Sequence, residues 1–201
     1  MAHIGGVETR ALMSEILDLL RPGDILTHCY TGAPNLTGDF TNIVQDGRLL
    51  PAALAANQRG VVFDVGHGRG SFDYTLAEAA IAQGCPPDTI SLDIHVVSGN
   101  TPGVPYLTWV MSKFLGLGFP LEKVVAMARS TRPRSSTASQ SSAPCRSGHP
   151  GCSDHGAGRG SGQLCRHRNN TRNSTVHLQA VQTVTVGVPF GRPDNMPFAV
   201  K

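Results

Sequence analysis

The chain has 201 residues, of which 40% are hydrophobic, and a formal net charge of +3. This length predicts one domain, or one domain with a small addition, and the absence of a run of about 18 apolar residues argues against a membrane span. The 17 Lys and Arg residues form no cluster in the first 130 positions, which argues against nucleic acid as a partner there.

The N-terminus and the cysteines favour a cytoplasmic protein. Met1 is followed by the residues AHIGG, which lack the basic and apolar regions of a signal peptide. The five cysteines are an odd number at scattered positions, and without a secretion signal we expect reduced thiols.

Short apolar runs alternate with helical spacing of apolar residues along the first 130 positions. In chain order we expect a strand at 2–6, a helix at 11–20, a strand at 24–30, a helix at 51–58, a strand at 61–67, a helix at 73–84, a strand at 89–96, and helices at 105–118 and 121–128. Pro22 and Gly23 end the first helix, and Pro51 stands at a favoured helix start. Strands and helices in this alternation predict an α/β fold with a parallel sheet.

The composition changes near Arg129. Residues 130–168 contain no Val, Ile, Phe, Tyr, Trp or Met, and only one Leu. We expect this segment to be disordered, because it lacks the apolar surface to form a core, and we interpret it as a changed reading frame. Residues 174–191 are strand-like again, so we expect a short β region within 169–201.

Chemically competent side chains stand at or near the end of each predicted strand. They are His3, His28, His67, and the pair Asp93 and His95. The carboxyl ends of parallel strands share one edge of a sheet, where active sites gather. Imidazole and carboxylate groups at one edge suit a divalent metal such as zinc, which can activate water, with Asp93 as the carboxylate that accepts its proton.

Four segments of the chain together resemble the amidohydrolase superfamily, in its dihydroorotase-like branch of amidohydrolases and deacetylases. These segments are HIGG, LRPGDILTHCYTG, GVVFDVGHGRGSFDY and TISLDIHVVSGN. The resemblance covers residues 2–130 almost continuously. It implies strands five to eight, with their helices, of a TIM (β/α)8 barrel, a binuclear zinc site, and a remnant of the small C-terminal β-domain at 169–201.

The resemblance also implies roles for individual residues. His3 and His28 would bind metal, and Asp93 would be both a metal ligand and the proton shuttle. The substrate-binding residues would be His67, Gly68, Arg69 and Tyr30, and His95 would at most support the site from behind. The implied reaction is hydrolysis of an amide, cyclic amide or N-acetyl bond in a small molecule by metal-bound hydroxide.

The chain departs from the family pattern in having neither the first-strand His-x-His pair nor the bridging lysine of the fourth strand. We therefore expect an incomplete barrel that is inactive alone. An N-terminal half encoded separately, or a homo-oligomer, are possible partners, and a non-catalytic, pseudogene-like fragment is the alternative.

A second zinc-binding possibility lies between residues 145 and 167. Cys145, His149, Cys152 and His155, with Cys165 and His167 nearby, resemble a small Cys/His module. Their spacing matches no strong zinc-finger template, and no apolar residues flank them to form a small core. The arginines of this region make loose nucleic-acid binding a remote alternative, because no aromatic residue is interleaved for stacking.

Overall fold

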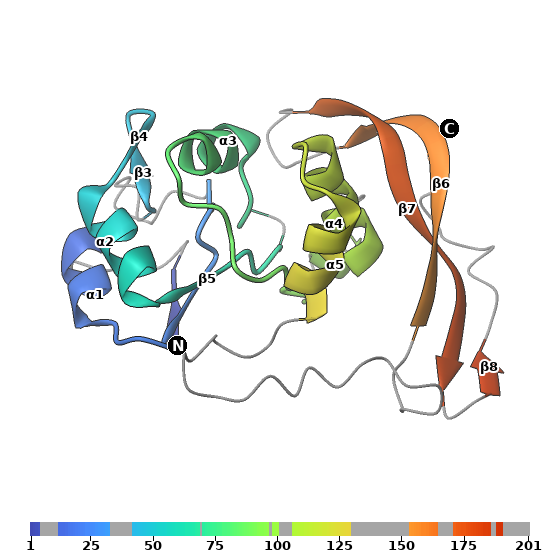
Figure 1. Ribbon diagram of the computed structural model, residues 1–201, viewed down its shortest axis with the longest axis horizontal. Coiled ribbons are helices and arrows are strands. Elements are labelled where there is room, and N and C mark those ends of the chain that lie inside the picture. The colour runs from blue at the N-terminus through green and yellow to red at the C-terminus, as the bar shows by residue number, and fades with distance from the viewer. Residues whose placement is uncertain are drawn as a thin grey trace.

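The computed structural model describes residues 1–4, 12–32, 42–68, 70–96, 98–100, 106–129, 153–164, 171–185 and 188–190. The structure is a mixed α/β fold with a parallel sheet at its N-terminal side and an antiparallel sheet at its C-terminal side (Figure 1). The helices α4 (Leu107–Gly116) and α5 (Leu121–Arg129) lie between these two sheets.

The parallel sheet has the strand order β1 (Ala2–His3), β2 (Ile25–Thr27) and β5 (Val62–Asp64). The register places His3 beside Thr27 and Thr27 beside Asp64, so the strand ends are level with one another. This arrangement confirms the predicted parallel sheet.

The strand predicted at 89–96 forms only two isolated parallel bridges, Asp64 to Thr89 and His67 to Leu92. Between them the backbone of Gly66 turns into the left-handed region, with φ of 52°. This turn interrupts the extended backbone that follows β5. Residues 64–67 and 89–92 are therefore paired by single hydrogen bonds rather than by a regular ladder.

Five helices follow the predicted pattern with slightly different ends: α1 (Met13–Leu19), α2 (Pro51–Arg59), α3 (Tyr74–Ala82), α4 (Leu107–Gly116) and α5 (Leu121–Arg129). Pro51 is the first residue of α2, where its missing N–H costs nothing. The Asp73 carboxylate caps α3 by accepting from the Thr75 N–H at 2.9 Å. A single 3-10 turn, η1 (Ser98–Asn100), precedes α4.

A small hairpin of β3 (Val44–Gln45) and β4 (Arg48–Leu49) was not predicted. Its turn residues Asp46 and Gly47 both have positive φ, of 50° and 74°. Asp-Gly is a favoured pair for such a two-residue turn, so this dipeptide was the signal that could have revealed the hairpin.

The antiparallel sheet has the order β6 (Ser153–Leu164), β7 (Arg172–Thr185) and β8 (Val188–Phe190). Its first strand contradicts the prediction that residues 130–168 contain no regular structure. Backbone hydrogen bonds to β7, whose sequence is rich in β-branched residues, need no apolar side chains on β6, and composition alone did not reveal this pairing. The other residues of 130–168 lie outside the described part of the chain.

The first half of β7 is attached to the helices by hydrogen bonds at Arg172 and Leu178. The buried Leu178 N–H donates to Ser112 Oγ in α4 at 2.8 Å, and Arg172 makes two hydrogen bonds of 2.7 Å to the Glu78 carboxylate in α3. Figure 1 shows β7 running beside α4.

Among the described helices, none is long and apolar enough to cross a membrane.

Candidate metal centre

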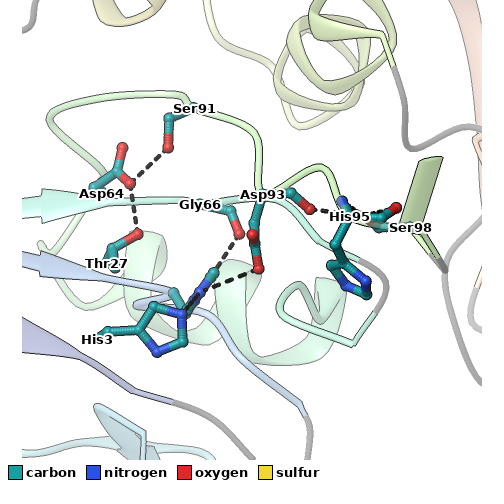
Figure 2. A network of polar contacts seen from close by, with 9 residues as sticks. His3, Thr27, Asp64, Gly66, Ser91, Asp93, His95 and Ser98 are labelled. Carbon is teal, nitrogen blue, oxygen red and sulfur yellow. Dashed lines mark hydrogen bonds and ion pairs between the residues drawn. The ribbon is translucent and has the colours of Figure 1, made fainter.

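Three predicted site residues meet at the carboxyl edge of the parallel sheet. His3 ends β1, His28 follows β2, and Asp93 follows the bridge at Leu92. The Nε2 atoms of His3 and His28 are 2.7 Å apart, and His28 Nε2 is 3.7 Å from Asp93 Oδ2. One potential ligand atom from each residue lies within 4.8 Å of the others, and Figure 2 shows His3 and Asp93 directed to this common point.

The imidazole of His28 is held in one tautomer by the backbone. Its Nδ1 is 2.6 Å from the carbonyl oxygen of Gly66, which can only accept, so Nδ1 carries the hydrogen. The lone pair of Nε2 therefore faces His3 and Asp93. Histidines that bind metals are commonly oriented in this way, by donating the other ring N–H to a backbone carbonyl.

Two unusual backbone conformations make this contact possible. His28 has a φ of 63°, which is uncommon for a residue with a side chain. A Cβ atom added to Gly66 would lie 2.7 Å from His28 Nδ1 and would collide with the Thr27 hydroxyl. Only glycine therefore allows the chain to pass so close to the His28 ring.

The electrostatic environment favours the neutral form of His28. Burial lowers the pKa of this imidazole below its ordinary value, and the nearby His3 lowers it further. Neutral imidazole is the form that binds metals. The Nε2 atoms of His3 and His28, 2.7 Å apart, must share either one hydrogen or one cation. Together with the nearby Asp93 carboxylate oxygen, they form a set of ligand atoms that suits zinc.

Asp93 combines a fixed backbone with an accessible carboxylate. Its N–H donates to the His67 carbonyl at 3.1 Å, and its carbonyl accepts from Ser98 Oγ at 2.7 Å. The side chain is 44% exposed, and a Cβ atom at Gly68 would lie 3.3 Å from Oδ2. A carboxylate so placed can bind a cation and still exchange protons with a molecule from solvent.

The structure places two of the residues expected to bind substrate in the core. His67 is buried, stacks on Phe72, and has its Nε2 2.8 Å from Lys113 Nζ. Burial, and then the charge of Lys113, lowers the pKa of His67 well below its ordinary value. Tyr30 is also buried, and its hydroxyl donates to the Cys85 carbonyl at 2.9 Å.

The remaining predicted site residues differ in their surroundings. Gly68 lies beside the Asp93 carboxylate, whereas His95 is exposed and its ring points away from His3 in Figure 2. Arg69 lies outside the described residues. So do Cys145, His149, Cys152, Cys165 and His167, and only the backbone of His155 is described, in β6.

Two buried polar residues near the site were not singled out from the sequence. Asp64 is the last residue of β5 and accepts three side-chain hydrogen bonds. Lys113 is buried in α4 against His67. Each was visible as a charged residue within an otherwise apolar strand or helix, where an ionised group needs partners.

The chain is similar in sequence to three deacetylases. It is 42% identical over 125 residues to one from Agrobacterium fabrum, 40% identical over 125 residues to one from Brucella anthropi, and 34% identical over 126 residues to one from Enterococcus faecalis. Each match covers 62% of this chain but only 29%, 29% and 32% of the respective relative. The chain therefore spans about a third of the length of these curated relatives. No protein-family model matches it.

Solved structures show the same fold. A dihydroorotase matches with a TM-score of 0.72 and 28% identity over 94% of this chain and 48% of its own. An adenine deaminase matches with a TM-score of 0.72 and 21% identity over 92% of this chain and 49% of its own. These two structures thus contain the described architecture as about half of a larger chain.

Proposed function

We propose that this chain, which belongs to the amidohydrolase superfamily, binds a divalent metal ion through His3, His28 and Asp93 as part of a hydrolase of amide bonds in small molecules. The observation that carries this proposal is the convergence of two imidazole nitrogens and one carboxylate oxygen within 4.8 Å. Zinc is the ion we propose, because neutral imidazole nitrogen and carboxylate oxygen are its usual ligands.

The sheet fits the arrangement that the family uses. Its strands neighbour one another in the order in which they occur along the chain, all parallel, and the segment 89–92 continues this order beyond β5. We place them as strands five to eight of a (β/α)8 barrel, whose active site lies at the carboxyl ends of its strands.

A metal ion held by these residues would supply polarisation of the substrate carbonyl and a lowered pKa of water. The residues themselves would perform the proton transfers. The Asp93 carboxylate would accept a proton from the attacking water as its oxygen bonds to the carbonyl carbon. The same carboxyl would then deliver that proton to the leaving nitrogen as the C–N bond breaks, which yields a carboxylic acid and an amine.

The remaining parts of the site would orient these groups. His28 would keep its tautomer through its hydrogen bond to Gly66, and Gly68 would leave room for the substrate beside Asp93. Because His67 and Tyr30 are buried, they would shape the wall of the pocket rather than touch the substrate directly. Arg69 would be the group that contacts a polar end of the substrate.

The names of the sequence relatives favour an N-acyl substrate such as an N-acetylated amine over a cyclic amide. Three ligating side chains, however, are fewer than the five or six of a binuclear site in this family. We therefore propose that the chain alone binds metal but that turnover requires further ligands. Such ligands are not found among the residues that the structure describes.

The proposal is tested by equilibrium binding of zinc to the full chain, with hydrolysis of N-acetyl amino acids measured in parallel. We expect one zinc ion per chain and no measurable hydrolysis. Absence of zinc binding would contradict the metal site, and robust hydrolysis by the chain alone would contradict the need for further ligands. Asp93→Asn, which keeps the shape of the side chain, should weaken zinc binding, because it replaces a charged ligand by a neutral amide.

A further inference from the structure

Asp64 is a buried carboxylate whose hydrogen bonds all come from hydroxyl groups on neighbouring segments. Its Oδ2 accepts from Thr27 Oγ1 and from Ser91 Oγ, both at 2.7 Å, and its Oδ1 accepts from Thr89 Oγ1 at 2.6 Å. The residue is only 7% exposed. Hydrogen bonds to an ionised acceptor are stronger than those between neutral groups, so the carboxylate holds these hydroxyls firmly.

Two of these three hydroxyls belong to residues within two positions of the candidate metal ligands. Thr27 directly precedes His28, and Ser91 stands two positions before Asp93. Both hydroxyls meet on the same atom, Asp64 Oδ2, as Figure 2 shows. The segments that carry His28 and Asp93 are therefore both hydrogen-bonded to one atom at the end of β5, the strand that lies between them.

We propose that Asp64 is a positioning residue of the metal centre, which sets the placement of His28 relative to Asp93 through the hydroxyls of Thr27 and Ser91. This inference rests on the proposed function, since it needs His28 and Asp93 to be ligands. A metal site requires its ligands to be held within about 0.5 Å of the productive geometry, and packing and hydrogen bonds behind the ligands supply this precision.

Thr89 provides an internal comparison. Its hydroxyl donates to the same carboxylate over a similar distance, but to the other oxygen, and it stands four positions before Asp93. Removal of the Thr89 hydroxyl should destabilise the fold about as much as removal of the Thr27 hydroxyl. It should leave the hydrogen bonds from Thr27 and Ser91 to Asp64 Oδ2 in place.

The test compares Thr27→Val, Ser91→Ala and Thr89→Val in the full chain. For each variant, zinc affinity is measured by competition with a chelating dye, and the free energy of unfolding is measured by urea denaturation without metal. We expect Thr27→Val and Ser91→Ala to weaken zinc binding by about 10–100-fold, the usual effect of removing a group that supports a ligand. Thr89→Val should bind zinc as the unchanged chain does, with a comparable loss of stability.

A conservative variant of Asp64 separates its hydrogen bonds from its charge. In Asp64→Asn the amide oxygen can accept from Thr27 and Ser91 while the amide N–H donates to Thr89, so we expect zinc affinity close to that of the unchanged chain. Asp64→Ala removes all three contacts and should lose as much affinity as Thr27→Val. If Thr27→Val does not fold, Ser91→Ala and Asp64→Asn still decide the question.

The outcomes separate this inference from the proposed function. Failure of the unchanged chain to bind zinc overturns the metal site and the role of Asp64 with it. If the unchanged chain binds zinc but Thr27→Val, Ser91→Ala and Thr89→Val all bind it equally well, or all lose affinity in proportion to their stability, the positioning role is wrong while the metal site stands.

Discussion

The Nε2 atoms of His3 and His28 face each other at 2.7 Å, although the residues are 25 positions apart in the chain. The two rings are perpendicular, with centroids 4.2 Å apart. Because His28 Nδ1 donates to Gly66, the hydrogen shared by the two Nε2 atoms in the absence of a cation must come from His3. A cation can replace that hydrogen without any change in the tautomer of His28.

Loss of the His28 imidazole should therefore abolish tight zinc binding. His28→Asn is the suitable variant, because asparagine tolerates the positive φ of this position better than alanine does. We expect zinc affinity to fall by more than about 100-fold, because removing a group that only hydrogen-bonds to a ligand already lowers metal affinity by about 10–100-fold. The matched control is His95→Ala at the exposed imidazole, which should bind zinc unchanged; both affinities are measured by dye competition.

The close passage of Gly66 past His28 predicts that alanine is harmful at this position. Gly66→Ala should lower the free energy of unfolding by more than the roughly 1–2 kcal/mol that a left-handed backbone costs a residue with a Cβ, because the added methyl also collides with Thr27 and His28. Gly84→Ala is the control: Gly84 has a φ of 89° but nothing within 4 Å of an added Cβ. Equal losses in urea denaturation would show that the predicted collision is absent.

His67 should make the stability of the fold depend on pH. Its pKa is well below the ordinary value of about 6.5 in the folded chain, so the unfolded chain takes up a proton on this residue that the folded chain does not. The contribution of His67 to the free energy of unfolding is therefore constant above about pH 6.5. It is lost as the pH falls from there toward the pKa in the folded chain, and the free energy of unfolding then changes by at most about 1.4 kcal/mol per pH unit.

His67→Asn should reduce this slope, because asparagine does not titrate. The measurement is urea denaturation of both proteins at several pH values below 6.5, and the difference between their slopes isolates His67 from the other titrating groups. Identical slopes would mean that the imidazole is not held in its neutral form beside Lys113.

The contact between β7 and α4 predicts a specific loss for one small substitution. Ser112→Ala removes the oxygen that accepts from the buried Leu178 N–H, and an unsatisfied buried donor costs about 1–3 kcal/mol. Arg172→Ala removes a partly exposed ion pair to Glu78 and should cost less than about 1 kcal/mol after screening by solvent. If Ser112→Ala is no more costly than Arg172→Ala, β7 is not docked on α4 as described.

Local sequence patterns predicted much of the parallel half of the fold. Helical spacing of apolar residues, Pro51 at a helix start and the apolar strand before His67 each gave an element at nearly the observed position. Strand ends also predicted the neighbourhood of His3, His28 and Asp93, because parallel strands bring their carboxyl ends to one edge.

Properties that depend on long-range contacts were not predictable in the same way. The strand β6 forms because β7 offers it a partner, and nothing in its glycine-rich composition signals that pairing. The burial of His67 against Lys113 and the three hydroxyls on Asp64 involve residues separated by 25 to 46 positions. Only the folded chain shows which polar groups these buried residues meet.

The central claim, that His3, His28 and Asp93 bind the metal, is tested most directly by X-ray absorption spectroscopy of the zinc-loaded full chain. We predict nitrogen and oxygen ligands at about 2.0–2.1 Å, with imidazole scattering from two histidines, and loss of this zinc signal in His28→Asn, which should no longer bind zinc tightly. Sulfur ligands at about 2.3 Å, unchanged by His28→Asn, would contradict the account and assign zinc to the cysteines between residues 145 and 165 instead.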